Sequence, residues 1–382
     1  MGSPDPLAWL DEHAGRRRDA GLRRTLRPRT AQDELIDLAS NDYLGLSRDP
    51  RVVEAGIEAL RTWGAGSTGS RLVTGSTTLH AELETELAAF TGTQAALVFS
   101  SGYAANLGAV VALSGPGSLV VSDAANHASL VDACRLSRAR VVVTPHADPM
   151  AVDATLAGRD EERALFVTDS VGSVDGDLAP LTELHAVCRA HGAVLVVDEA
   201  HGIGVRGERG QGLVAEAGLA GEPDLVCTAT LSKSLGSQGG AVLGPRRVIE
   251  HLVDTARTFI FDTGLAPANA AAALAALRVL ATEPSRPAAV LAAAARVAAA
   301  AAVPAPPSAI VSVLLGEPDR AVAAATRCHE LGVRVGCFRP PSVPAGTSRL
   351  RLTARATLTD EELDKVDGVL AEVLAQVRGT PS

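Results

Sequence analysis

The sequence predicts an α/β protein in which a large, mostly parallel sheet is joined to a smaller α+β part. Short runs of aliphatic and β-branched residues recur over the first two thirds of the chain without polar alternation. Such runs indicate strands buried on both faces, and helical periodicity between them is typical of parallel strands joined by helices. Nearer the C-terminus, polar residues alternate within the strand-like runs, which favours a sheet with one face in the core.

The expected elements follow this division. The strands predicted for the large sheet are 95–99, 118–121, 140–144, 164–168, 193–198, 225–228 and 240–244. Helical spacing is found at 52–63, 104–113 and 129–137. In the smaller part the predicted strands are 309–315, 333–338 and 348–353, followed by a helix over about 359–377.

The character of the sequence changes twice. An Arg-rich amphipathic pattern covers residues 7–30, and the alternation of buried strands and helices ends near residue 281. We therefore expect an N-terminal arm (1–44) that packs with the small domain, a large domain (45–280) and a small C-terminal domain (281–382).

Composition excludes several classes of function. The net charge of −9 argues against nucleic acid as the main partner, because phosphate binding requires a basic face. The Ala-rich stretch 290–303 is too short for a membrane span and contains Arg296, so a soluble helix is expected. The five cysteines include no C-x-x-C pair, and residues 1–6 do not resemble a signal peptide. We expect a cytoplasmic protein with reduced thiols, and no metal ligands are assigned.

The scarcity of lysine is the most informative single feature. Only Lys233 and Lys365 occur among 35 basic residues. An amine can lose its proton and attack a carbonyl, whereas a guanidinium stays charged. Lys365 lies in a charged stretch typical of a solvated helix, but Lys233 directly follows an apolar run. Lys233 is therefore the candidate nucleophile.

Other polar residues follow predicted strands, where open α/β sheets bind ligands. Asp198 ends one strand, His201 comes three residues later, and Lys233 follows the next strand. A carboxylate at a strand end is often only a helix cap. Combined with the lysine, however, it can pair with a protonated pyridine nitrogen and make a pyridoxal ring an electron sink.

A phosphate site is predicted nearby. The segment 100–103 (Ser-Ser-Gly-Tyr) follows a strand and opens a helix, so its N–H groups can bind an anion at the positive helix end. Thr230 and Ser232 add hydroxyl groups beside Lys233. His127, also after a strand, could stack on an aromatic ring or simply cap a helix.

One motif suggests another class of protein. Residues 64–69 match the dinucleotide fingerprint G-x-G-x-x-G, which would make the chain a nicotinamide-dependent oxidoreductase. That fingerprint requires a preceding strand, whereas 52–63 has helical spacing. A flexible loop at the active site is the favoured interpretation, and the oxidoreductase remains the alternative.

Taken together, these segments resemble the α-oxoamine synthases, enzymes with pyridoxal 5'-phosphate and the aspartate-aminotransferase (type I) fold. The resemblance covers nearly the whole chain, and six motifs occur in the family's order. They are 41–47 (Asn-Asp-Tyr-Leu-Gly-Leu-Ser), 101–106 (Ser-Gly-Tyr-Ala-Ala-Asn), 127–130 (His-Ala-Ser-Leu), 198–202 (Asp-Glu-Ala-His-Gly), 230–233 (Thr-Leu-Ser-Lys) and 339–353.

The resemblance implies specific roles. Lys233 would hold the cofactor covalently and then act as acid and base, with Asp198 on the ring nitrogen and His201 on the phenolic oxygen. His127 would stack on the ring, so the implied catalytic residues are Lys233, His127, Asp198 and His201. The cofactor would also be bound by Gly102, Tyr103, Ser173, Thr230 and, reaching into the neighbouring subunit of a homodimer, Thr263. Substrate contacts would come from Arg23, Asn41, His127, Thr347 and Arg351, of which Arg351 would bind the amino-acid carboxylate.

Within the family the chain looks most like the biotin-pathway members, especially the Arg-rich actinobacterial ones. This implies decarboxylative condensation of L-alanine with pimeloyl-CoA or a pimeloyl carrier thioester. Glycine with acetyl-CoA, or another reaction of the family, is the nearest alternative, and a catalytically dead binding protein is disfavoured. One departure stands out: many relatives read Thr-Glu-Gly-Val-Phe-Ser where this chain has Thr-Asp-Ser-Val-Gly-Ser at 168–173. Asp169 and Gly172 therefore put the local packing beside Ser173 in question.

Overall fold

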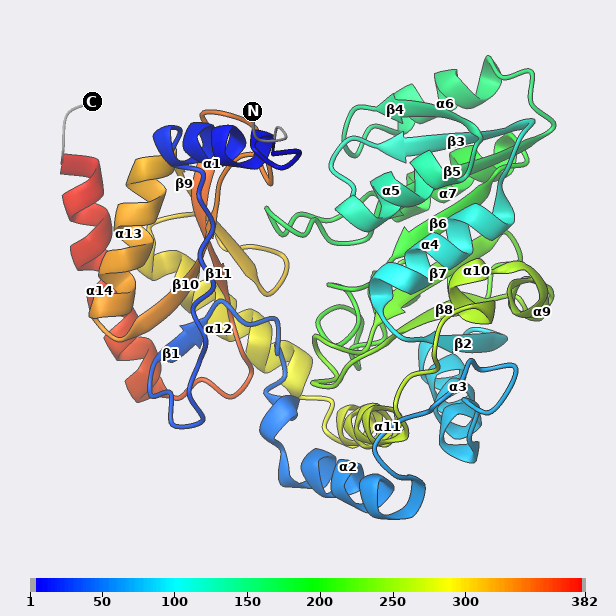
Figure 1. Ribbon diagram of the computed structural model, residues 1–382, viewed down its shortest axis with the longest axis horizontal. Helices are drawn as coiled ribbons and strands as arrows, with labels where there is room; N and C mark the ends of the chain where they lie inside the picture. Colours follow the sequence, from blue (N-terminus) through cyan, green and yellow to red (C-terminus); the bar gives the residue numbers. More distant parts are fainter. Residues whose placement is uncertain (1–4, 380–382) are drawn as a thin grey trace.

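The computed structural model describes residues 5–379 and contains two sheets, each with its own helices (Figure 1). The seven-stranded sheet has the order β2-β8-β7-β6-β5-β3-β4, and the four-stranded sheet has the order β1-β10-β11-β9. The strands of the larger sheet are β2 (Ala95–Phe99), β3 (Ser118–Asp123), β4 (Arg140–Thr144), β5 (Arg163–Asp169), β6 (Val194–Asp198), β7 (Leu225–Thr230) and β8 (Gly240–Gly244). Those of the smaller sheet are β1 (Ile36–Leu38), β9 (Ile310–Gly316), β10 (Val333–Phe338) and β11 (Ser348–Thr353).

Helices cover both faces of the large sheet. The helices of this part are α2 (Pro50–Trp63), α3 (Thr78–Thr91), α4 (Gly102–Leu113), α5 (Ala128–Leu136), α6 (Pro149–Ala157), α7 (Leu181–Ala190), α8 (Leu213–Glu216), α9 (Arg246–Thr255), α10 (Arg257–Ile260) and α11 (Pro267–Thr282). One apolar cluster joins α3, α6, α7, α8 and α11 to alternate strand residues, and a second joins α4, α5, α9 and α10 to the others. The predicted α/β class with a mostly parallel sheet is confirmed, since only β8 runs antiparallel to its neighbours.

The expectation of burial on both faces is wrong for β4. This strand lies at the edge of the sheet, where Val141 and Val143 are 38% and 64% exposed. Its sequence is as apolar as that of the central strands, so the difference comes from strand order alone.

The four-stranded sheet packs against α12 (Arg286–Ala300), α13 (Pro318–Glu330) and α14 (Asp360–Gly379). Its first strand, β1, comes from the N-terminal segment and pairs in parallel with β10, with Ile36 opposite Val333. Polar alternation in β11 does not mark a solvent face, because Arg349, Arg351 and Thr353 are all buried. Arg349 and Arg351 contact Asp175 and Ser173 in the large part of the chain, whereas Thr353 donates to the carbonyl of Ser40.

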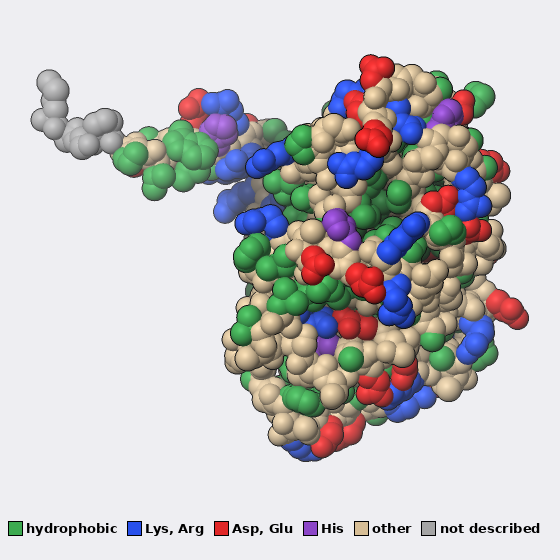
Figure 2. Space-filling view, turned by 90° about the vertical axis from the view of Figure 1, so that its right-hand side faces the viewer, with side chains coloured by type: hydrophobic (Ala, Val, Ile, Leu, Met, Phe, Trp, Pro, Cys, Tyr) green, Lys and Arg blue, Asp and Glu red, His purple; other side chains and the backbone are tan. Residues whose placement is uncertain are grey.

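The helix α1 (Trp9–Asp19) has no buried residue and projects from the body of the molecule (Figure 2). Lys and Arg side chains gather where it joins the body. The following segment is fixed by Arg339, whose guanidinium donates to the carbonyls of Gly21 at 2.8 Å and Arg23 at 2.6 Å.

Two further expectations concern regions outside the sheets. The glycine-rich segment 64–69 follows α2 rather than a strand, so the dinucleotide fingerprint lacks its structural context. Within residues 5–379, no helix is both long and apolar enough to cross a membrane. The first four residues, part of the segment examined for a signal peptide, lie outside the described range.

Candidate active site

Most of the predicted site residues lie at one edge of the large sheet. Asp198 ends β6, Thr230 ends β7, His127 follows β3 and Gly102 follows β2. These strands run in the same direction, so their carboxyl ends meet at this edge. Lys233 follows β7 by three residues and is therefore brought to the same place.

Lys233 is the centre of a connected hydrogen-bond chain. Its Nζ lies 2.8 Å from Nε2 of His201, and Nδ1 of His201 lies 2.6 Å from the hydroxyl of Tyr43. Tyr43 donates to Oδ1 of Asn41 at 3.1 Å, and Arg351 donates to the same oxygen at 3.0 Å. One connected network thus joins the lysine amine to the guanidinium of Arg351.

The environment favours the neutral forms of both nitrogen bases. Removal from water lowers the pKa of Lys233 to about 8, although the charge of Asp198 opposes this effect. Burial also lowers the pKa of His201 well below its usual value, and the nearby charge of Lys233 acts in the same direction. The amine can therefore lose its proton near neutral pH, as a base or nucleophile requires.

Asp198 is held rigidly. Its Oδ2 accepts from Nδ2 of Asn106 at 2.7 Å, and its Oδ1 accepts from the backbone N–H of Ala200 at 2.9 Å. Asn106 also donates to Ser129 at 2.8 Å, so several elements fix the carboxylate. Asp169 lies beside it in the sheet register, and burial together with the charge of Asp198 raises the pKa of Asp169 well above its usual value.

The N-terminus of α4 forms an anion cradle. Ser101 caps the helix by accepting from the N–H of Ala104 at 3.1 Å. A Cβ at Gly240 would lie 2.4 Å from the carbonyl oxygen of Ser101 and 2.5 Å from the nitrogen of Gly102, so glycine is required at this position. The hydroxyls of Thr230 and Ser232 are 2.7 Å apart next to this turn. Exposed N–H groups, hydroxyls and the helix end together suit a phosphate.

His127 and Tyr103 lie on the open side of this site. His127 is exposed, and its Nδ1 lies 2.7 Å from the hydroxyl of Ser129. Its backbone N–H donates to Oδ2 of Asp169 at 2.9 Å. Partial removal from solvent lowers the pKa of His127. Tyr103 is 45% exposed, and its hydroxyl donates to Asp132.

Ser173 takes part through its backbone. Its carbonyl accepts from Nε of Arg351 at 2.6 Å, and the guanidinium carbon of Arg351 lies 5.4 Å from the ring centre of Phe338. Arg351 is therefore oriented from two sides, by Asn41 and by Ser173.

Three predicted residues are not part of this hydrogen-bonded centre. Arg23 is exposed on the N-terminal arm, and Thr347 donates to the carbonyl of Pro344 at 2.7 Å. Thr263 is exposed and pairs with Ser70 in an isolated bridge. Conversely, sequence reasoning assigned no role to Tyr43 or Asn106, although both occur in the motifs that carried the resemblance.

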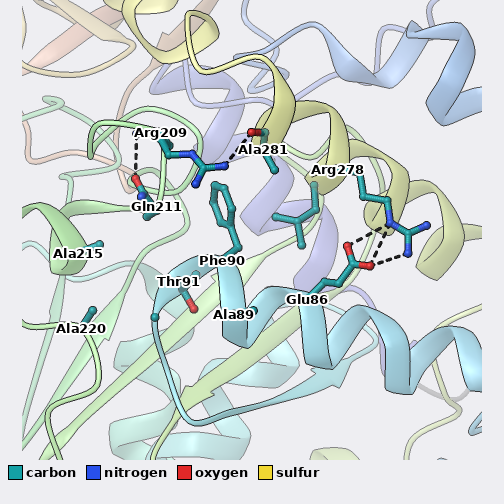
Figure 3. A pocket seen from close by; sticks show the side chains of 12 residues that line it. Glu86, Ala89, Phe90, Thr91, Arg209, Gln211, Ala215, Ala220, Arg278 and Ala281 are labelled. Carbon is teal, nitrogen blue, oxygen red and sulfur yellow. Dashed lines mark hydrogen bonds and ion pairs between the residues drawn. The ribbon is translucent and has the colours of Figure 1, made fainter.

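Another cavity, of about 540 Å³, lies between α3, α11 and the segment 209–220 (Figure 3). Among the described residues that line it, none is a candidate site residue. Its guanidinium groups are already bonded, Arg209 to the carbonyl of Ala281 at 2.8 Å and Arg278 to Glu86 at 2.5 Å. We assign it no function.

The site at the sheet edge fits pyridoxal phosphate by its donor set. It offers a lysine amine of lowered pKa, a fixed buried carboxylate, and an anion cradle in which a Cβ at Gly240 would not fit. Fold and site together define a pyridoxal-phosphate enzyme of the aminotransferase type.

Comparison with known proteins gives the family. A model of the family "Aminotransferase class I and II" matches residues 33–369, and the chain belongs to this family. The 8-amino-7-oxononanoate synthase of Mycobacterium sp. (strain JLS) is 70% identical over 374 residues, 98% of each chain. That of Mycolicibacterium smegmatis (strain ATCC 700084 / mc(2)155) is 68% identical over the same share of each chain.

Solved structures agree with this fold. Serine palmitoyltransferase of Sphingomonas wittichii has a TM-score of 0.92 at 33% identity, covering 99% of this chain and 100% of its own. A structure of SPT with its PLP internal aldimine has a TM-score of 0.92 at 32% identity, covering 98% and 100%. The 8-amino-7-oxononanoate synthase of Francisella tularensis has a TM-score of 0.78 at 26% identity, covering 91% and 99%. The predicted type I fold and its pyridoxal-phosphate cofactor are thereby confirmed.

Proposed function

We propose that the chain catalyses the 8-amino-7-oxononanoate synthase reaction of biotin biosynthesis. In this reaction the Cα of L-alanine is joined to the acyl carbon of a pimeloyl thioester, and the thiol and CO₂ leave. The hydrogen-bond network from Lys233 to Arg351 carries the proposal, because it connects a proton-accepting amine to a guanidinium suited to a carboxylate. The high identity to mycobacterial enzymes of this name supports the choice of substrates.

Pyridoxal phosphate, when bound, supplies an electron sink for negative charge at Cα of the amino acid. Lys233 holds the cofactor and, once free and neutral, removes the Cα proton. Its lowered pKa of about 8 leaves a much larger neutral fraction near neutral pH than the usual value of 10.5 would. His201, 2.8 Å away, orients the amine.

The other residues bind and orient. Asp198, fixed by Asn106, would keep the ring nitrogen of the bound cofactor protonated, and His127 would stack on the ring. Gly102, Tyr103 and Thr230 would bind its phosphate at the α4 N-terminus, and Ser173 would contribute to the cofactor site. Arg351, assisted by Asn41, binds the alanine carboxylate, Arg23 contacts the acyl substrate, and Thr347 also contacts substrate.

We further propose a homodimer, supported by apolar residues exposed near the Ser70–Thr263 bridge. Leu72, Val73 and Phe261 are 53%, 79% and 70% exposed. Large apolar side chains exposed in this way are typical of a protein interface. In this dimer Thr263 would contact the phosphate of the neighbouring subunit.

The same proposal divides the chain into the arm 1–44, a large domain 45–280 and a small domain 281–382, and places the enzyme in the cytoplasm. The separate apolar clusters of the two sheets support the division.

Turnover of a panel of thioesters tests the substrate assignment. Pimeloyl, acetyl and long-chain thioesters would each be supplied with L-alanine or glycine, and the amino ketone product identified by mass. We expect product with L-alanine and pimeloyl thioester; turnover of glycine and acetyl-CoA in preference would contradict the proposal.

A further inference from the structure

The segment of residues 172–177, here called the bridge loop, connects the two parts of the molecule. It is closed at its base by an isolated bridge between Val171 and Leu178. Within it, the N–H of Gly172 donates to the carbonyl of Asp177 and the N–H of Gly176 to that of Gly172, both at 2.9 Å. The loop is therefore a compact turn, and its position depends on the contacts that residues 173–177 make with other segments.

On one side the bridge loop is bound by β11 of the small sheet and by the segment that precedes β9. Ser308 donates to the carbonyl of Gly176 at 2.7 Å, and Arg349 pairs with Asp175. Arg351 donates through Nε to the carbonyl of Ser173 at 2.6 Å. The orientation of the Arg351 guanidinium thus depends on where the bridge loop lies.

On the other side the loop is bound by a histidine in the turn that follows β4. His146 lies between two carboxylates, with Nδ1 2.7 Å from Asp123 and Nε2 2.6 Å from Asp177. Asp123 is buried and is itself fixed by the N–H groups of Ala125 at 2.8 Å and Ala147 at 2.9 Å. Hydrogen bonds to Asp123 and then Asp177 raise the pKa of His146 to about 10, so the imidazolium form persists at neutral pH.

Gly172 makes this contact possible. A Cβ at position 172 would lie 2.3 Å from Oδ1 of Asp177, so a side chain there would displace this carboxylate. The absence of a side chain at Gly172 leaves this space to the carboxylate that binds His146. Gly172 and the contact between Asp177 and His146 are therefore two parts of one arrangement.

We propose that His146 is a positioning residue for the amino-acid substrate. By binding Asp177 it fixes the bridge loop, and through the carbonyl of Ser173 it fixes the orientation of Arg351. This inference rests on the proposed role of Arg351 in binding the alanine carboxylate.

The test is His146→Ala in the holoenzyme, with L-alanine and the acyl thioester varied separately. We expect the KM for L-alanine to rise about fivefold to tenfold, the scale of one lost hydrogen bond, with the KM for the thioester unchanged. Amide hydrogen exchange should become faster in residues 172–179, a readout independent of turnover.

Gly172→Ala should also break the contact between His146 and Asp177. The added methyl group would displace the Asp177 carboxylate without removing a polar group. The double variant with His146→Ala should be no worse than either single variant, since both break one contact. His191→Ala is the matched control: His191 also binds a carboxylate, Asp153 at 2.8 Å, but lies before β6 at the opposite end of the strands from Lys233.

An unchanged KM for L-alanine in both single variants would overturn the inference, as would fully additive effects or equal effects on both substrates. Failure of the proposed function is a separate result, because the unmodified enzyme would then not turn over L-alanine with the pimeloyl thioester.

Discussion

The amine of Lys233 lies 2.8 Å from Nε2 of His201, at a point where burial lowers the pKa of both groups. Two bases in contact cannot both carry a proton without strong repulsion, and the charge of Lys233 lowers the pKa of His201 further, so the imidazole is the group that stays neutral. The contact orients the amine, since His201 is held on its other side by Tyr43, while burial lowers the pKa of the lysine.

Replacement of Lys233 by Arg should abolish turnover. Arginine keeps the positive charge but can neither form the bond to the cofactor nor accept the Cα proton. The measurement is product formation together with borohydride labelling, which in the unmodified enzyme should mark Lys233. Near-normal turnover of Lys233→Arg would disprove the mechanism.

The lowered pKa of Lys233 also predicts how stability depends on pH in the cofactor-free protein. Below about pH 8 the lysine is charged in both states, and burying that charge destabilises the fold. Between about pH 8 and the unfolded value of 10.5, the unfolded chain holds a proton that the folded chain has lost, so stability rises with pH. Lys233→Met should therefore stabilise the protein most below about pH 8 and progressively less towards 10.5. Urea unfolding of both proteins across this range measures the difference, and a pH-independent difference would contradict the assignment.

Asp198→Asn should retain some cofactor but lose most exchange of the alanine Cα proton. A neutral amide cannot keep the ring nitrogen protonated, and loss of a buried charge partner costs about 3–5 kcal/mol. Exchange into heavy water, followed by NMR, measures this step without the acyl substrate. Asp224→Asn is the control, because Asp224 pairs with Arg189 in an exposed ion pair. Exchange at the unmodified rate in Asp198→Asn would rule out the assigned role.

Gly240→Ala should weaken cofactor binding. The new methyl group would displace the turn at Ser101 and Gly102, and overpacking of this kind costs about 1–3 kcal/mol, or about fivefold to hundredfold in Kd. Gly66→Ala is the control, since a Cβ there meets nothing within 4 Å. Titration with pyridoxal phosphate measures both; equal affinities would place the phosphate elsewhere, and a defect in Gly66→Ala alone would favour the segment 64–69 instead.

The sequence predicted those features that depend on local pattern. Buried strands are visible as apolar runs, and because parallel strands end at one edge, Asp198, His201 and Lys233 could be placed together. Strand order is not contained in any single run, so the edge position of β4 and its exposed Val143 could not be foreseen.

Contacts between segments far apart in the sequence could not be predicted from local sequence patterns either. β1 pairs with β10 across most of the chain, and Tyr43 reaches His201 from the motif 41–47, in which only Asn41 had been assigned a role. The alternation in β11 was read as one buried and one solvated face, whereas its polar face contacts the other part of the molecule. Only the packing of the two parts gives Arg351 its partners at Asn41 and Ser173.

We expect acyl-chain preference to depend on the arginine-rich arm. Arg23 is exposed, and its backbone is fixed by Arg339, next to Phe338, whose ring lies 5.4 Å from the guanidinium carbon of Arg351. In the proposed function Arg23 would pair with the distal carboxylate of a pimeloyl chain, a group that acetyl and palmitoyl chains lack. A charge-assisted contact is worth about 1.5–3 kcal/mol, or about tenfold to hundredfold in preference.

Arg23→Ala should therefore reduce kcat/KM for pimeloyl-CoA by about tenfold to hundredfold and leave the low activity with acetyl-CoA unchanged. Arg163→Ala is the control, because Arg163 is exposed at the start of β5, at the opposite end of that strand from the site. Competition between the two thioesters at saturating L-alanine measures the preference directly. If the unmodified enzyme used acetyl-CoA as efficiently as pimeloyl-CoA, the pimeloyl assignment would fail while the chemistry at Lys233 would stand, since the amine and Arg351 act on the amino acid alone.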